Sequence, residues 1–143
     1  MHGMKRLLLI LVLLLPALPG SSSAQLDEAT LAKRQARKNL VIREWNTDAR
    51  SRTRWLDRVT TYDDQGRKIE EIEYTPYGQK WRETYEYGGN GRINKDVLYN
   101  EKNKPVLIRK YEYNPDGTKK KQFNYAPNGK LQTTKIFEYS LTE

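Results

Sequence analysis

The sequence lacks the two side chains on which much metal and enzyme chemistry depends. None of its 143 residues is cysteine, and its only histidine is His2. The absence of cysteine excludes disulfide bonds, thiolate chemistry and lipid attachment through a cysteine. If the first residues are removed on export, as argued next, no imidazole remains to bind zinc or copper or to act as a general base. We therefore expect no metal ion and no cofactor.

Long apolar runs are also absent, except for one at the N-terminus. Lys5 and Arg6 precede an apolar run from Leu7 to Leu15, which Pro16 interrupts. This is the layout of a secretory signal peptide, and the run is shorter than the ~18 residues of a spanning helix. The alternative interpretation is an uncleaved membrane anchor. Export predicts a periplasmic or extracellular protein.

Small residues mark the end of the predicted signal. Ser22 and Ala24 suit the positions before a cleavage site, so we place cleavage between Ala24 and Gln25, and Met4 is an alternative start. The expected organisation is a signal peptide over 1–24, an N-terminal helical segment over 25–40 and a β-hairpin repeat domain over 41–143.

An excess of positive charge remains after the signal is removed. Lys5 and Arg6 are the only charged residues within 1–24, so 24 basic residues face 18 acidic ones, a net charge of +6. The charges are interspersed, which favours a solvated surface, and Lys119 to Lys121 form the one short basic run. The alternative is affinity for a polyanion through the charged face.

A tyrosine repeat dominates the rest of the chain. Seven tyrosines recur at spacings of 12 to 14 residues: Tyr62, Tyr74, Tyr87, Tyr99, Tyr113, Tyr125 and Tyr139. Four residues after each of the first six stands a turn residue: Gly66, Gly78, Gly91, Asn103, Gly117 and Gly129. A large apolar residue precedes most of the tyrosines by two positions, so the unit is Φ-x-Tyr-x-x-x-Gly, where Φ is a large apolar residue.

The turns predict the hairpin type. Asn114 to Gly117 and Ala126 to Gly129 place proline where a type I turn needs it and glycine where a left-handed residue closes a bulge. Thr75 to Gly78 has the same layout. Asn103 replaces glycine and is followed by Pro105, so we expect this hairpin to be the least regular.

The segments between turns have the length and near-alternation of strands. Consecutive strands joined by tight turns pair antiparallel, so the predicted fold is mainly β, a single antiparallel meander of about seven or eight strands. We expect the repeat aromatics and their apolar partners on one face: Ile72, Tyr74, Tyr85, Tyr87, Val97, Tyr99, Tyr111, Tyr113, Phe123, Tyr125, Phe137 and Tyr139. Leaving this apolar face exposed to water would cost free energy. We therefore expect the sheet to curl on itself or the protein to self-associate.

The residues before the first repeat have a different pattern. Asp27 can cap a short helix from Glu28 to roughly Asn39. An irregular first hairpin should follow, from Val41 to Trp45 and from Arg54 to Tyr62, with Trp45 and Trp55 in the core.

The segment from Tyr62 to Arg67, Tyr-Asp-Asp-Gln-Gly-Arg, resembles the YD (RHS-type) repeats of bacterial secreted and cell-surface proteins. Gly91-Arg92-Ile93 and Gly129-Lys130-Leu131 are similar to the residues that follow the glycine in those repeats. The resemblance covers about Trp55 to Tyr139, but only Tyr62 is followed by aspartate, and the array is short and carries no toxin domain. It implies a β-hairpin architecture in a bacterial envelope setting, and no activity.

The chain carries no recognisable catalytic motif. A Ser-His-Asp site needs a histidine, and Gly88 to Gly91 is a hairpin turn with no helix behind it to hold a phosphate. Paired carboxylates, Glu71 with Glu73 or Glu83 with Glu86, have the composition of a glycosidase site. The recurrence of glutamate at one repeat position, Glu73, Glu86, Glu112 and Glu138, favours solvated ion pairs instead. We predict that the protein is not an enzyme.

The aromatic residues offer the main candidate ligand surface. Five of them could form a platform for sugar rings: Trp81, Tyr85, Tyr87, Tyr111 and Tyr113. The same residues fill positions that the repeat needs for packing. The sequence thus predicts an exported, non-catalytic β-repeat module that binds a protein or a cell-envelope component. The alternatives are a carbohydrate-binding module and a polyanion binder; self-association is open, nucleic acid is not expected, and the membrane is contacted only through an uncleaved signal.

The signal peptide leads to the first testable prediction. Protein recovered from the native envelope fraction should begin near Gln25, because processing removes residues 1–24. N-terminal sequencing or intact mass would establish the terminus. Cytosolic protein that retains Met1 or Met4 would contradict export.

Overall fold

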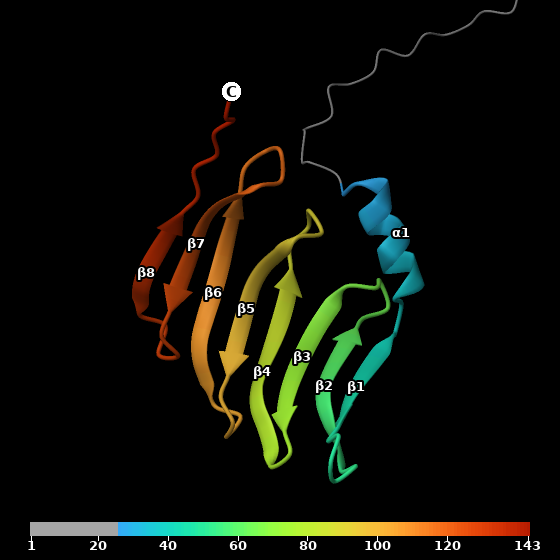
Figure 1. The fold of residues 1–143 in the computed structure, drawn as a ribbon. Coiled ribbons are helices and arrows are strands. Elements are labelled where there is room, and N and C mark those ends of the chain that lie inside the picture. The colour runs from blue at the N-terminus through green and yellow to red at the C-terminus, as the bar shows by residue number, and fades with distance from the viewer. Residues whose placement is uncertain (1–25) are drawn as a thin grey trace, which may run out of the picture.

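Residues 26–143 form a single sheet of eight strands preceded by one short helix. The structure is a computed structural model that describes residues 26–143, so the predicted signal peptide lies outside the described residues. The elements are α1 (Glu28–Ala36), β1 (Val41–Thr47), β2 (Arg54–Tyr62), β3 (Lys68–Thr75), β4 (Gly78–Tyr87), β5 (Ile93–Tyr99), β6 (Pro105–Tyr113), β7 (Lys119–Tyr125) and β8 (Leu131–Ile136). The strands lie side by side in sequence order, and every neighbouring pair is antiparallel (Figure 1). The predicted mainly β meander is confirmed.

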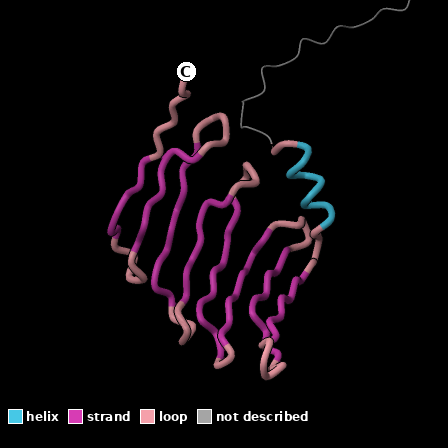
Figure 2. Tube along the Cα trace, in the orientation of Figure 1, coloured by secondary structure: helices cyan, strands magenta, loops and turns pink. Residues whose placement is uncertain are grey.

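Helix α1 begins where the sequence predicts and ends earlier. The Asp27 carboxylate accepts a hydrogen bond of 2.6 Å from the Thr30 amide and caps the first turn. The helix stops at Ala36 rather than Asn39, because Asn39 adopts a left-handed φ of 54° and turns the chain into β1. Figure 2 shows α1 standing beyond one end of the strands.

Five of the six repeat turns have one hydrogen-bond pattern. In the first, the Gly66 amide donates to the carbonyl of Asp63, and the Asp63 amide donates to the carbonyl of Arg67. The same two bonds recur at the turns that contain Gly91, Asn103, Gly117 and Gly129, and all five residues have φ between 58° and 87°. This is the predicted type I turn closed by a left-handed residue.

Two details of the turn prediction are wrong. The turn expected to be least regular, at Asn103, matches the other four, because asparagine tolerates the left-handed region almost as well as glycine. The irregular turn is the one before Gly78, where Thr75 pairs directly with Gly78 across a two-residue loop. Gly78 has a φ of 140°, far from the other five values.

A bulge follows each repeat turn, and it determines which way the side chains point. In the hairpin of β5 and β6, Leu98 pairs with Leu107 while the next residue, Tyr99, pairs with Pro105, which leaves Val106 without a partner. An equivalent shift adjoins the repeat tyrosine in every hairpin from β2–β3 to β7–β8. One extra residue reverses the alternation of side chains beyond it.

This reversal places successive repeats on opposite faces, so the prediction of one aromatic face is wrong. Tyr85 pairs with Asp96 and Asp96 with Arg109, whereas Val97, the residue after Asp96, pairs with Ile108. We call the side with Asp96 and Arg109 the network face; it also carries Tyr85, Tyr87, Tyr111 and Tyr113. The opposite face carries Ile72, Tyr74, Val97, Tyr99, Phe123 and Tyr125.

Within residues 26–143, no second layer covers either face of the sheet and no hydrophobic side chain is buried. Among residues 26–143, the buried polar side chains are those of Thr60 and Asp96, at 7% and 3% exposure. Trp45 is 47% exposed and Trp55 is half-buried, so the expectation that both belong to a core is wrong. All residues of the two edge strands, β1 and β8, are exposed.

The contact between α1 and the first repeat turn supports a second prediction. Gly66 and Gly129 share a left-handed φ, but a Cβ on Gly66 would lie 1.8 Å from the carbonyl oxygen of Arg34, whereas a Cβ on Gly129 meets nothing. Gly129→Ala should cost about 1 kcal/mol of unfolding free energy from backbone strain alone. Gly66→Ala should cost about 1–3 kcal/mol more, because the helix must also move.

Urea unfolding would measure both variants, and hydrogen exchange over residues 28–36 would report whether α1 detaches. Equal losses for the two variants, with unchanged exchange in the helix, would contradict the packing of α1 on this turn.

Candidate functional site

The five predicted platform residues share the network face. Trp81 pairs with Glu73 and Tyr85 with Asp96, and Tyr87 follows Tyr85 by two positions. Tyr111 and Tyr113 lie on the same side of β6, with ring centres 6.4 Å apart. All five are half-buried. Their role in ligand binding stays a prediction.

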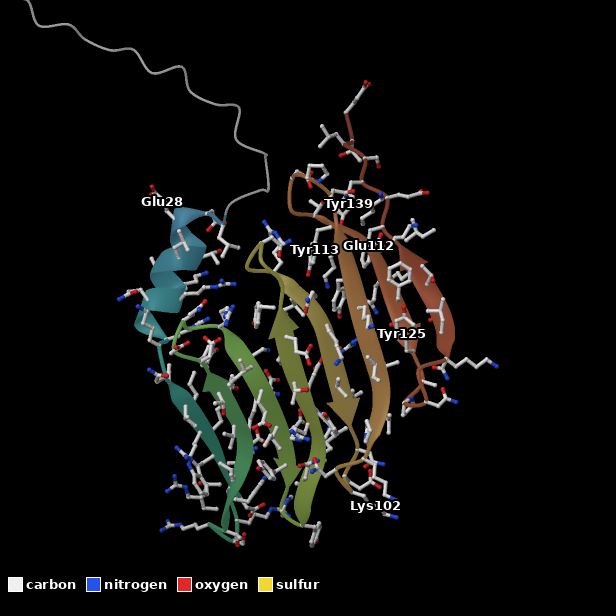
Figure 3. The ribbon with its side chains drawn as sticks, turned by 180° about the vertical axis from the view of Figure 1, so that it is seen from behind. Glu28, Lys102, Glu112, Tyr113, Tyr125 and Tyr139 are labelled. Carbon is white, nitrogen blue, oxygen red and sulfur yellow. The ribbon has the colours of Figure 1, made fainter. Side chains whose placement is uncertain are left out.

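Several tyrosine hydroxyls on this face are already used within the sheet. Tyr87 donates to the carbonyl of Lys68 at 2.8 Å, and Tyr113 donates to the carbonyl of Ile93 at 2.5 Å. Tyr139 donates in the same way to the carbonyl of Lys119, at 2.8 Å. Each acceptor is the first residue of the neighbouring strand, so the three tyrosines hold strands together at one end of the sheet, where Figure 3 labels Tyr113 and Tyr139.

A charged network occupies the centre of the network face. The Asp96 carboxylate accepts hydrogen bonds from Nε of Arg109 at 2.6 Å and from the Tyr111 hydroxyl at 2.5 Å. The guanidinium of Arg109 also bonds to the carboxylate of Glu83. Because Asp96 is almost fully buried, these two donors satisfy oxygens that would be costly to bury without hydrogen bonds.

The network shifts the acid–base behaviour of its members. Burial, reinforced by Glu83, raises the pKa of the Tyr85 phenol, and burial with Asp96 raises the pKa of the Tyr111 phenol. Burial alone would lower the pKa of Arg109, but the bond to Asp96 outweighs it and the net shift is upward. The phenols therefore stay neutral donors and Arg109 stays a cation across the physiological range.

The carboxylate pairs considered from the sequence are separated or neutralised. Glu83 and Glu86 lie on opposite faces, since they are three positions apart in β4, and Glu86 pairs with Lys95 at 3.2 Å. Glu73 is 2.8 Å from Lys80, and this bond lowers its pKa. A general acid in glycoside hydrolysis needs a raised pKa, which is the opposite direction.

Beside the network lies an open cavity of about 290 Å³ lined by Trp81, Glu83, Leu98 and Arg109. It combines the indole of Trp81 with the Glu83 carboxylate and the Arg109 guanidinium, which form an ion pair with each other. Of these residues, sequence reasoning identified Trp81 and Glu83 and missed Leu98, Arg109 and the buried Asp96. A register that ignored the bulge would have paired Tyr85 with Lys95, so the alternation alone could not identify Asp96 as its neighbour.

Residues 26–143 contain no group of three or more histidine, cysteine, aspartate or glutamate side chains arranged to hold a metal ion. The one helix in this range is too short and too polar to span a bilayer.

Comparison with known proteins identifies no relative from which a function can be transferred. No protein-family model and no curated protein matches the chain. One similar solved structure is the GtfA/B complex bound to UDP and GlcNAc, with 13% sequence identity over 66% of this chain. Another is the G117R mutant of S. aureus TarM in complex with Fondaparinux, alpha-GlcNAc-glycerol and UDP, with 18% sequence identity over 73% of this chain. The TM-score is 0.30 in both cases, and this chain covers 20% and 23% of those chains.

The Asp96 network predicts that one hydroxyl carries measurable stability. Tyr111→Phe removes a donor from a buried carboxylate and should cost about 1.5–3 kcal/mol. Tyr125→Phe is the matched control: it lies on the opposite face, where its ring contacts Lys110, and should change stability by less than about 0.5 kcal/mol.

The pH dependence of unfolding tests the same network. Because the pKa of Tyr111 is raised on folding, its contribution is fully present below the ordinary tyrosine pKa of about 10 and is lost as the pH rises further. Tyr111→Phe should therefore flatten the loss of stability above about pH 10. Denaturant melts of the unchanged protein, Tyr111→Phe and the control Tyr125→Phe would measure stability across this pH range. Equal losses of stability above about pH 10 in the unchanged protein and in Tyr111→Phe would contradict the assignment.

Proposed function

We propose that the chain is an exported, non-catalytic β-repeat module that binds a protein of the bacterial cell envelope, in the periplasm or outside the cell, by adding a strand of that protein to its sheet. The observation that carries this proposal is the open edge at β8. An exposed edge strand presents unpaired amides and carbonyls that can pair with another chain, and natural sheets usually protect such edges.

The β8 edge has fewer protecting features than the β1 edge. Strand β1 carries two adjacent charged residues, Arg43 and Glu44, which hinder pairing with a further strand, and its pairing with β2 is interrupted at Asp57. Strand β8 has the sequence Leu-Gln-Thr-Thr-Lys-Ile, with one charge and no proline. Leu131 and Ile136 are 46% and 65% exposed, so a docked strand would gain apolar contacts as well as hydrogen bonds.

A photo-reactive amino acid at position 134 would test the edge. Thr134 lies in the middle of β8 and is exposed, so a partner strand should be captured there in intact cells. Position 112 is the matched control, because Glu112 is exposed on the same face but belongs to the interior strand β6. We expect adducts with one envelope protein at 134 and none at 112.

Two results would contradict edge docking. An adduct of two copies of this chain would reassign the edge to self-association. Equal labelling at both positions would show nonspecific capture.

Carbohydrate binding is the second candidate, supported by the cavity beside Trp81. Sugar sites combine an aromatic face with a few fixed polar groups, as Trp81, Glu83 and Arg109 do here. Absence of adducts at position 134, together with saturable glycan binding that Trp81→Ala abolishes, would favour this function over edge docking.

A further inference from the structure

A second recess, separate from the β8 edge and from the Asp96 network, lies between α1 and the end of β2. It has a volume of about 270 Å³. Five of its lining residues are basic, and none is acidic: Lys33, Arg34, Arg37, Arg67 and Lys68. We call these five residues and the space between them the helix cleft. Cavities that hold small ligands measure roughly 300–1,000 Å³, so this volume suits one compact group rather than a long molecule.

The positive charge of the helix cleft is only partly balanced. Nε of Arg67 lies 2.8 Å from Asp63, and the ammonium of Lys68 lies 2.8 Å from Glu71. Within residues 26–143, no carboxylate lies at ion-pair distance from the other three basic residues of the cleft, Lys33, Arg34 and Arg37. Cations brought together on a folded surface repel one another, and an anion between them would remove that cost.

Two guanidinium groups from different elements converge on one aromatic ring. The Arg34 guanidinium lies 5.6 Å from the centre of the Tyr87 ring, and that of Arg67 lies 5.2 Å from it. Arg37 lies 5.3 Å from the ring of Tyr62 in the same recess. The rings hold the guanidinium planes in place, while the remaining N–H groups stay available as donors.

The helix cleft is formed in advance of any ligand. Arg34 donates to the carbonyl of Gly91 at 2.6 Å, which fixes its side chain across the turn. The Arg34 backbone packs so closely on Gly66 that no side chain would fit there. The Tyr87 hydroxyl is bonded to the carbonyl of Lys68. Donors that are already positioned bind an anion with little further ordering.

We propose that the helix cleft binds a phosphate group, carried either by a soluble phosphate ester or by a lipid headgroup. Arginine forks match the oxygens of phosphate, and three unbalanced cations suit a multiply charged oxyanion better than a single carboxylate.

Arg37→Gln is the variant that tests the cleft. Arg37 is exposed and contacts the Tyr62 ring rather than an ion-pair partner, so its removal should leave the fold intact. Lys102→Gln is the control, because it removes the same charge in the exposed turn before β6, at the end of the sheet away from α1 (Figure 3). Circular dichroism and thermal melts would establish that both variants are folded.

The probes are glycerol phosphate, measured by titration calorimetry, and vesicles of phosphatidylglycerol compared with phosphatidylcholine. We expect saturable, salt-sensitive binding that Arg37→Gln weakens about tenfold, as the loss of a charge-assisted hydrogen bond would, and that Lys102→Gln changes less than about twofold. Binding of glycerol phosphate assigns a soluble ester, and binding of phosphatidylglycerol vesicles alone assigns a headgroup. No saturable binding of either probe, or equal weakening by both variants, would overturn the proposal.

Discussion

The absence of a second layer within residues 26–143 is the constraint on which the rest of this structure depends. A sheet that is wet on both faces cannot draw its stability from a buried apolar core, so contacts between side chains of neighbouring strands must supply it. Tyrosine and arginine suit this task, because each has a broad apolar body and a polar end that reaches the next strand. Arg82 lying 3.9 Å from the ring centre of Tyr99 is one such contact, and Tyr87 bonded to the Lys68 carbonyl is another.

Because a bulge follows each turn, successive sequence repeats present their side chains on opposite faces of the sheet. Each sequence unit of 12 to 14 residues corresponds to one strand and one turn. In three dimensions the equivalent environment recurs only at every second unit, as the matching hydroxyl bonds of Tyr87, Tyr113 and Tyr139 show. Placing alternate units on opposite faces divides the aromatic residues between two half-buried surfaces. Each surface is then a mixture of aromatic and charged residues rather than one continuous aromatic face.

The same arrangement separates three surfaces with different chemistry. The helix cleft lies at one end of the sheet, the Asp96 network lies in the middle of one face, and the free backbone of β8 lies at an edge. Asp96 is satisfied by Arg109 and Tyr111, which is the pattern of a structural group. The basic residues of α1 and the backbone groups along β8 have bonding capacity that the rest of residues 26–143 leaves unused.

The sequence by itself determined the strands, five of the six repeat turns and the capped start of α1, because these depend on short-range rules: alternation, a left-handed residue at a fixed position and a carboxylate before a helix. It also identified Trp81, Tyr85, Tyr87, Tyr111 and Tyr113 as residues of one face. Only the tertiary structure decided that Tyr74, Tyr99 and Tyr125 face the other way, that Trp45 is exposed, and that Asp96 meets Arg109. The physical reason is the bulge: one unpaired residue in each hairpin reverses every side chain beyond it, and the alternation of residue types along a strand does not reveal that residue.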